Sequence, residues 1–272
     1  MNYLRPGGPV NRRFVAPGAE MNTGTYEPHE VTVTNARALP SSPTLESHGF
    51  QLLNHRSAIS DFSDEEEVNR LYPAETEALV ARATGADMVV TFGWVRRMSH
   101  VSPGGSIQPP GADVHVDIAP NRAEPAIERV LEMAGRSVPS WSRFYISSLW
   151  RAVSPPPQDW PLAVCAGYSV ADDEGENNVM IRVEELPEGD EVFAPVPGEE
   201  NMPAASIFPY SAGHEWFYYP DMTRDEALLF GFYDSAQGRN WRVPHTSFRD
   251  TQVDVPHARD SIEIRSIAFW LD

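Results

Sequence analysis

The sequence has few groups that could cross-link the chain or insert it into a membrane. Its single cysteine, Cys165, leaves no intrachain disulfide possible, which fits a reducing compartment and predicts a cytoplasmic protein. Cys165 lies in the apolar run 161–165, so we expect it to be a buried small hydrophobic residue. No apolar run reaches the roughly 20 residues that a membrane-spanning helix needs. Residues 1–14 also lack the apolar core of a signal peptide.

Positive charge is also scarce. The chain has 21 lysine and arginine residues against 39 aspartate and glutamate residues, which gives a formal net charge of −18. A nucleic-acid-binding domain needs a basic surface, and so does a protein that binds anionic lipids. We therefore expect neither a nucleic-acid partner nor a membrane partner. At 272 residues, the chain is long enough for one large β domain or two small ones.

The 25 proline and 18 glycine residues predict many turns, as β-sandwiches and jelly rolls have. One helical region begins at a capping box of Ser63 and Glu66, is interrupted by Pro73 and continues over 74–83. A second helix is expected over 123–134. Runs rich in β-branched and aromatic residues predict strands elsewhere, over 31–34, 49–53, 87–95, 114–118, 142–150, 162–166, 179–183, 215–219, 226–233 and 262–270.

Three segments define the expected domain organisation. Residues 1–28 are rich in proline and glycine without periodicity, so we expect an extended or poorly ordered N-terminal arm. Residues 29–272 contain no internal repeat and no clear linker, so we expect a single domain of mainly β structure. The acidic segment 184–201 also contains several prolines and glycines, which is typical of either a solvated loop or a mobile lid.

The stretch 114–118 carries the first sign of chemistry. His115 and Asp117 are two positions apart in a short apolar strand, so both side chains point to the same face. One imidazole and one carboxylate are two thirds of the 2-His-1-carboxylate triad that binds non-haem Fe(II) and leaves coordination positions open. The alternative is an exposed polar face on an edge strand.

A third ligand would come from a distant strand, and His214, His245 and His257 are the candidates. Near the end of the chain, Arg259 and Ser261 share one face of an expected strand. Arginine offers a bidentate fork to a carboxylate, and serine adds a hydroxyl donor. The alternative for Arg259 is a surface arginine paired with one of the many acidic groups.

The order of these motifs, His-x-Asp, a distant His and then Arg-x-Ser, resembles the Fe(II)/2-oxoglutarate-dependent dioxygenases. In that superfamily the second histidine precedes the arginine by a strand and a turn. His245 lies 259 − 245 = 14 positions before Arg259, which fits, whereas His257 is too close to Arg259. The resemblance therefore ranks His245 first and His214 second.

A closer resemblance covers residues 85–270 and is to the AsaB-like hydroxylase/desaturase family, which includes gibberellin-desaturase-like and cephem-methoxylase-component-like proteins. The most distinctive block is 216–226, and the others occur in the same order as in the family. The sequence departs from the family at Ser148, Ala152 and Ala166, where asparagine, proline and aspartate are usual. The other blocks are 114–117, 143–151, 160–165, 233–235, 244–248 and 259–265.

The resemblance implies a double-stranded β-helix (a cupin-like jelly roll) with flanking α-helices, in which His115, Asp117 and His245 hold Fe(II). It also implies 2-oxoglutarate as co-substrate, with its far carboxylate on Arg259 and Ser261, and O2 as oxidant. Further contacts to the co-substrate are expected from Arg143 and Tyr145. Weaker candidates for substrate contacts are Trp150, Arg151, Trp216 and Phe248.

The implied reaction is oxidation of a small natural product, coupled to decarboxylation of 2-oxoglutarate to succinate and CO2. Hydroxylation is the default outcome, while desaturation, ring closure and endoperoxide formation branch from the same substrate radical. The alternatives are a non-redox jelly-roll metal-binding protein and a zinc hydrolase with the same three ligands. The pair Arg259 and Ser261 disfavours a hydrolase, which needs no anchor for 2-oxoglutarate. The prime substrate and the oligomeric state, including a homodimer, stay open.

Overall fold

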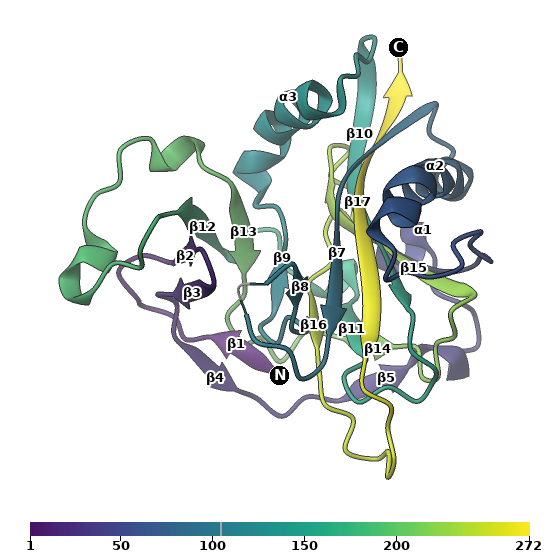
Figure 1. The fold of residues 1–272 in the computed structure, drawn as a ribbon, viewed down its shortest axis with the longest axis horizontal. Helices are drawn as coiled ribbons and strands as arrows, with labels where there is room; N and C mark the ends of the chain where they lie inside the picture. Colours follow the sequence, from purple (N-terminus) through teal and green to yellow (C-terminus); the bar gives the residue numbers. More distant parts are fainter. Residues whose placement is uncertain (104) are drawn as a thin grey trace.

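The computed structural model describes residues 1–103 and 105–272, and most of its regular structure is β-strand (Figure 1). The class predicted from the sequence, mainly β with a few helices, is confirmed. None of the helices in the described residues is both long and apolar enough to cross a membrane. The helices are α1 Leu45–His48, α2 Glu65–Thr84, α3 Ala123–Ala134 and the short 3₁₀ turns η1 Ala36–Ala38, η2 Pro120–Arg122, η3 Gly167–Ser169, η4 Gly189–Phe193 and η5 Glu199–Asn201.

A six-stranded sheet with the order β6-β15-β10-β17-β7-β8 contains the longest strands of the fold. Its central pair, β10 and β17, is antiparallel over almost its full length, and both strands pair with further antiparallel strands. The strands are β6 Phe50–Asn54, β7 Met88–Met98, β8 Ile107–Gln108, β10 Trp141–Ala152, β15 Glu226–Asp234 and β17 Asp260–Leu271.

A nine-stranded sheet with the order β3-β2-β12-β13-β9-β16-β11-β14-β5 carries the first metal-site motif on β9. A separate pair, β1 with β4, contacts residues next to β9 and β13, through bridges of Asn2 with Asp113 and of Leu4 with Pro209. The strands are β1 Asn2–Leu4, β2 Arg12–Ala16, β3 Ala19–Asn22, β4 Tyr26–Pro28, β5 Val33–Asn35, β9 His115–Val116, β11 Leu162–Cys165, β12 Glu176–Arg182, β13 Ala204–Ile207, β14 Trp216–Tyr218 and β16 His245–Ser247.

The alternation of side chains along β10 and β17 divides the core in two. Ile146 and Trp150 of β10 and Ile267 of β17 belong to the main cluster, which also contains buried residues of the nine-stranded sheet. Leu149 and Ile264, at intervening positions, belong to a second cluster with residues of α2. Since successive strand residues point to opposite faces, one face of the six-stranded sheet meets the other sheet and the opposite face meets α2.

The helix that covers this outer face differs from its prediction in two ways. Asp64 is its N-cap, accepting hydrogen bonds from the backbone N–H groups of Glu66 and Glu67, so the predicted capping box at Ser63 is wrong. Pro73 lies within one continuous helix and does not divide it. A proline inside a helix normally costs about 3 kcal/mol. Here a buried stripe holds the helix on the sheet, formed by Val68, Tyr72, Thr76, Leu79 and Val80.

The predicted N-terminal arm is also wrong. Residues 1–28 contain four strands, and β2 pairs in parallel with β12 of the nine-stranded sheet. Tyr3 and Phe14 are buried, at 0% and 3% exposure. These strands are only three to five residues long, so they are too short to show periodicity, and β2 pairs with the distant β12 as well as with the neighbouring β3. Such pairing is set by tertiary contacts and not by local preference.

The acidic segment 184–201 is tied to the N-terminal strands by one arginine (Figure 1, green loop beside β12 and β13). The Arg12 side chain is 4% exposed and contacts both carboxylate oxygens of Glu199, at 2.7 and 2.6 Å. Its Nη1 donates to the carbonyl oxygens of Val192 and Ala194. No residue of 184–201 lines the cavity described below. Closure of this segment over a ligand therefore stays a prediction.

We expect Arg12→Gln to lower the free energy of unfolding by about 2–4 kcal/mol, because it leaves two partly buried carbonyls and a carboxylate without their donor. Urea unfolding measures the loss, and hydrogen exchange localises it to residues 189–201. Arg5→Gln is the matched control: Arg5 is also paired with a glutamate, but its side chain is 65% exposed. Arg5→Gln should lower the free energy of unfolding by less than about 1 kcal/mol. Equal losses in the two variants would contradict a specific role for Arg12.

Candidate metal centre

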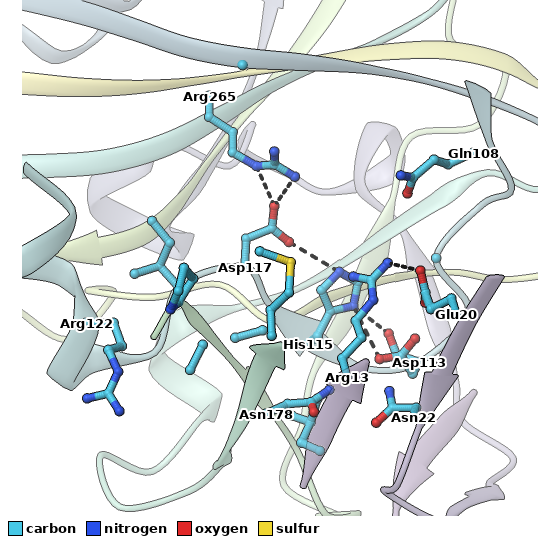
Figure 2. A pocket seen from close by; sticks show the side chains of 18 of the residues that line it. Arg13, Glu20, Asn22, Gln108, Asp113, His115, Asp117, Arg122, Asn178 and Arg265 are labelled. Carbon is cyan, nitrogen blue, oxygen red and sulfur yellow. Dashed lines mark hydrogen bonds and ion pairs between the residues drawn. The ribbon is translucent and has the colours of Figure 1, made fainter. Parts of the chain in front are cut away.

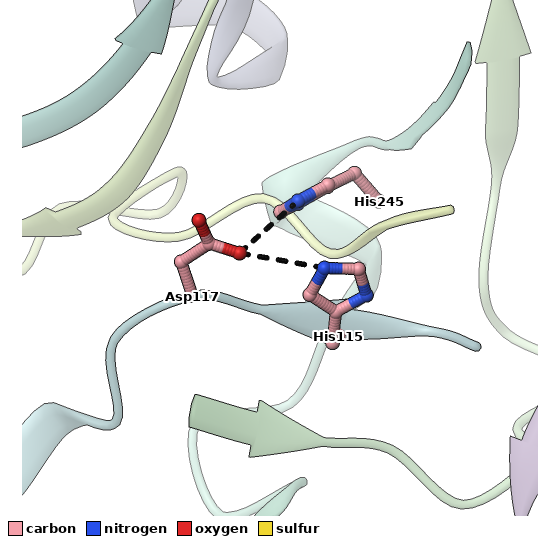
Figure 3. Close-up of side chains that lie close together, drawn as sticks. All are labelled: His115, Asp117 and His245. Atoms are coloured by element: carbon pink, nitrogen blue, oxygen red, sulfur yellow. Dashed lines mark ion pairs between the residues drawn. The ribbon is translucent and has the colours of Figure 1, made fainter. Parts of the chain in front are cut away.

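Two histidines and one aspartate converge where β9 and β16 pair. His115 and His245 face each other in this ladder, and Asp117 follows β9 directly. Asp117 Oδ1 lies 3.4 Å from His115 Nε2 and 3.7 Å from His245 Nε2 (Figure 3). One donor atom from each side chain lies within 4.8 Å of the other two. Within residues 1–103 and 105–272, this is the one such group of His, Cys, Asp or Glu side chains.

The donor set fits one small transition-metal ion. Ligand atoms about 2.1 Å from an ion and at right angles to one another lie roughly 3 Å apart. The observed separations are slightly longer than this, so small side-chain movements would complete the coordination. Two imidazoles and one carboxylate are the facial triad typical of non-haem Fe(II), with positions left open for other ligands.

Backbone carbonyls orient both imidazoles. His115 Nδ1 lies 2.7 Å from the carbonyl oxygen of Asp113, and His245 Nδ1 lies 3.3 Å from that of Val243. A carbonyl oxygen only accepts hydrogen bonds, so each Nδ1 carries the hydrogen. Each Nε2 is therefore the atom that faces Asp117, which is the usual arrangement of a metal-binding histidine and its outer hydrogen bond.

Asp117 uses its two oxygens for different partners. Its Oδ2 accepts a hydrogen bond from Arg265 Nε at 2.7 Å and lies 2.6 Å from Arg265 Nη2 (Figure 2). Its Oδ1 faces the two imidazoles (Figure 3). Arg265 also contacts Glu263, which pairs with Arg97 of β7. The second oxygen is thereby occupied, so the geometry favours Asp117 as a ligand through Oδ1 alone.

The charges of the site are strongly coupled. Burial opposes charge on His115, but Asp117 and Asp113 outweigh it and raise its pKa to about 9. Burial would raise the pKa of Asp117, yet Arg265 and the two histidines hold it well below its usual range. Burial and the neighbouring positive charge of His115 lower the pKa of His245. A metal ion takes the place of the proton on His115, because only neutral imidazole coordinates.

Arg259 is a buried cation beside the same strand. It is 1% exposed, its Nε donates to Ser261 Oγ at 2.8 Å, and its Nη1 donates to the carbonyl of Trp160 and to Ser247 Oγ. In the part of the chain that the structure describes, no carboxylate oxygen lies within 4.0 Å of its guanidinium. Burial and the charge of Arg97 lower its pKa to about 9, which leaves it cationic at neutral pH. The alternative of a surface arginine paired with an acid is thus excluded.

Of the four further candidates on β10, only Trp150 lies on the inner face. Arg259 lies over its ring, with the guanidinium carbon 5.1 Å from the ring centroid. The side chain of Arg143 pairs with Asp234 at the far end of the strand, and Tyr145 packs in the cluster on the α2 side. Arg151 donates to backbone carbonyls on that outer side. These three occupy odd-numbered positions and Trp150 an even one, so strand alternation turns them away from the metal centre.

The remaining candidates lie outside the cluster of ligands. Trp216 is buried and donates its indole N–H to a tyrosine of β1. Phe248 follows β16 and lines a separate, smaller hollow. His214 Nε2 lies 2.9 Å from Glu174 Oε2, and His214 is not among the side chains whose donor atoms converge with those of His115 and Asp117. Cys165 is fully buried, as predicted.

Sequence reasoning missed the aromatic wall behind His245. The His245 ring stacks on Phe232, with ring centroids 5.6 Å apart, and lies 4.8 Å from the ring of Phe230. Both phenylalanines belong to β15 of the six-stranded sheet, so His245 lies between the two sheets. Their spacing of two positions was a detectable signal, because it places both rings on one strand face.

A cavity of about 590 Å³ opens above the centre, and His115, Asp117 and Arg265 line its floor (Figure 2). This volume lies within the range of about 300–1,000 Å³ that is typical of small-molecule sites. Gly111 keeps the floor open, because a Cβ there would lie 3.2 Å from Cε1 of the His115 ring. The walls mix apolar and basic side chains from α3, β12 and β13.

Comparison with known proteins identifies the family of the chain. A family model described as an oxidoreductase/YMDC permease-like domain matches residues 1–269. The hydroxylase/desaturase CTB9 of Cercospora beticola is 30% identical over 91% of this chain and 78% of its own length. The Fe(II)/2-oxoglutarate-dependent dioxygenase nvfI of Aspergillus novofumigatus is also 30% identical, over 93% of this chain and 87% of its own.

The chain belongs to the Fe(II)/2-oxoglutarate-dependent dioxygenases of the hydroxylase/desaturase family. A solved structure of the iron and alpha-ketoglutarate-dependent endoperoxidase NvfI superposes with a TM-score of 0.80. It is 27% identical and covers 100% of this chain and 97% of its own. The family predicted from the sequence is therefore confirmed. This dioxygenase uses Fe(II), 2-oxoglutarate and O2, and the relatives do not favour a zinc hydrolase.

We expect His115→Ala, Asp117→Ala and His245→Ala each to abolish Fe(II)-dependent succinate formation, because three ligands are needed to hold the ion. Anaerobic titration with Fe(II) and the melting temperature separate lost binding from lost fold. His214→Ala tests the second-ranked histidine and should keep Fe(II) binding. The assignment of His245 fails if His245→Ala retains activity while His214→Ala loses it.

We expect Arg265→Gln to weaken metal binding by about 10- to 100-fold, as loss of a partner that orients a ligand typically does. Titration of the metal-free protein with Mn(II) or Co(II) measures the change without turnover. The control is Arg96→Gln, which removes an arginine paired with Asp260 and not with Asp117. Unchanged affinity in a folded Arg265→Gln variant would show that Asp117 needs no such support.

Proposed function

We propose that the chain forms one oxygenase domain with the double-stranded β-helix topology and oxidises a small natural product held in the 590 Å³ cavity. The observation that carries this proposal is the convergence of three metal ligands, two of which, His115 and Asp117, line the cavity, together with a buried arginine that has no carboxylate partner among the described residues. The names of the relatives, which include hydroxylases, desaturases and an endoperoxidase, support oxidation of a small molecule. Oxidation would be coupled to decarboxylation of 2-oxoglutarate to succinate and CO2.

The protein would hold Fe(II) through Nε2 of His115 and His245 and Oδ1 of Asp117. Bound Fe(II) supplies the redox chemistry by which O2 oxidises 2-oxoglutarate and then the substrate. The protein contributes position: the carbonyls of Asp113 and Val243 orient the imidazoles, and Arg265 orients the carboxylate. Buried aromatic side chains behind His245 keep water away from that side of the centre.

The co-substrate would lie between the metal centre and Arg259. His245 and Ser247 are two positions apart on β16, and their side chains share one face about 7 Å apart along the strand. The Arg259 guanidinium donates to Ser247 Oγ. The distance from its charge to the metal ligands is therefore about the length of a short dicarboxylate. 2-Oxoglutarate could then chelate the metal at its keto-acid end and pair its distal carboxylate with Arg259. Ser261 Oγ, which accepts from Arg259 Nε, holds the fork in place.

Anaerobic titration of the metal-free protein with Fe(II) and 2-oxoglutarate tests the whole assembly at once. A weak visible charge-transfer band should appear only when both are present, because it reports chelation of iron by the keto acid. The band should be lost in Asp117→Ala. Binding of both components without a band would contradict chelation at this centre, and a non-redox metal site would then be the better reading.

We expect Arg259→Gln to raise the 2-oxoglutarate requirement by at least about 30-fold. Loss of one partner of a buried charge pair costs about 2–5 kcal/mol, and about 1.4 kcal/mol corresponds to a factor of ten in affinity. The 2-oxoglutarate requirement of Arg259→Lys should lie between those of Arg259→Gln and the wild type, because lysine keeps a charge but loses the planar fork. The 2-oxoglutarate dependence of succinate release measures all three proteins, and metal affinity should change little.

Arg143→Gln is the control for this series, because Arg143 lies on the outer face of β10 and pairs with Asp234. Its 2-oxoglutarate requirement should match that of the wild type. An ordinary requirement in Arg259→Gln, or a larger loss in Arg143→Gln, would move the anchor of the co-substrate away from Arg259.

A further inference from the structure

The cavity above the metal centre has a basic lining in a strongly acidic protein. The whole chain has 39 acidic residues against 21 basic ones. Among the residues that line the cavity the balance is reversed, with six arginines against three carboxylates. The arginines are Arg13, Arg97, Arg122, Arg129, Arg182 and Arg265, and the carboxylates are Glu20, Asp113 and Asp117.

Three of these arginines line the cavity from α3, with the residue that precedes it, and from β12. Arg122 and Arg129 lie seven positions apart at the start and in the middle of α3, on the helix stripe that lines the cavity. Arg182 lies at the end of β12, on the same strand face as Met180 and Asn178, which also line the cavity. Two separate elements thus bring arginines to the lining of one cavity.

The same three arginines are the ones without an acidic partner. The other three pair with carboxylates at 2.6 to 3.3 Å, whereas Arg122, Arg129 and Arg182 have no carboxylate within 4.0 Å among the described residues. Arg122 Nε donates to the carbonyl oxygen of Met202, which fixes its position. Their charges are therefore available to a ligand.

Apolar side chains alternate with these charges. Val130 lies next to Arg129 on the cavity face of α3, and Met180 lies two positions before Arg182. Met133, one turn further along the helix, lines the cavity and is nevertheless 78% exposed. An exposed methionine beside unpaired arginines suits a ligand that has both an apolar body and an anionic group.

We propose that the substrate carries a carboxylate, which Arg122, Arg129 and Arg182 bind at the outer part of the cavity, while its apolar body extends towards the metal centre. This inference rests on the proposed function, because it takes the cavity as the substrate site. The distal carboxylate of 2-oxoglutarate has its own cation in Arg259, on the interior face of the six-stranded sheet. The arginines of α3 and β12 remain to orient the substrate and to select against neutral analogues.

Binding of a matched pair of probes tests this assignment. Decanoate and decanamide have the same apolar chain and differ in charge, and calorimetry with the full-length protein loaded with Mn(II) and 2-oxoglutarate measures both affinities. The double variant Arg129→Gln/Arg182→Gln should bind decanoate at least about tenfold more weakly, and decanamide within about twofold of the wild type. Decanoate binding to the wild type should also weaken as salt rises.

Arg70→Gln is the matched control, because Arg70 is an exposed arginine on a helix, α2, and does not line the cavity. It should leave both affinities unchanged. The proposal is overturned if the double variant binds decanoate as the wild type does, if it loses both probes equally, or if Arg70→Gln has the same effect.

The proposed function can fail separately from this one. Repeating the calorimetry on the metal-free protein shows whether the arginines bind the probe without the metal centre. Arginine-dependent decanoate binding in a protein that shows no charge-transfer band would retain the carboxylate site and reject the oxygenase. A raised 2-oxoglutarate requirement in the double variant, with unchanged decanoate binding, would instead assign these arginines to the co-substrate.

Discussion

The contact between Arg265 and Asp117 joins the two sheets at the floor of the cavity, and the metal centre depends on it. Arg265 belongs to β17 of the six-stranded sheet, whereas Asp117 follows β9 of the nine-stranded sheet. Placing two charges between sheets costs free energy unless each has partners of opposite sign. Glu263 and Arg97 supply them, so the network contains two positive and two negative groups. Loss of any one member would leave a buried charge uncompensated.

Because this network is balanced, Arg259 remains as an excess positive charge in the interior. Arg259 immediately precedes β17. Its side chain lies on the same face as those of Ser261, Glu263 and Arg265, because the odd-numbered positions of this strand point inwards. A buried cation without an anion is unfavourable. Binding of a dianion therefore relieves an electrostatic cost that the folded protein already carries. In the proposed assignment, Arg265 of β17 would orient a metal ligand, and Arg259, just before the strand and six positions away, would attract the co-substrate.

Residues whose geometry is local could be predicted from the sequence. His115 and Asp117 are two positions apart and needed only a short extended segment, although the strand proved to be two residues long. The family resemblance made both Arg143 and Trp150 candidate site residues, but it did not distinguish the two faces of β10. The alternation of side chains along the strand would have separated them. The strands of residues 1–28 were missed because each is very short, and because β2 is held partly by β12, 179 − 12 = 167 positions away in the sequence.

Burial also makes the type of basic residue important at Arg259. The chain contains no lysine, and all 21 of its basic residues are arginines. Burial lowers the pKa of Arg259 to about 9, so its charge persists at neutral pH. A free lysine has a pKa of about 10.4, against about 12.5 or more for arginine, so arginine holds its charge more firmly against burial. A lysine at this position would also lack the planar fork that pairs with both oxygens of a carboxylate. Arginine keeps the interior positively charged, and with it the electrostatic cost that a bound carboxylate removes.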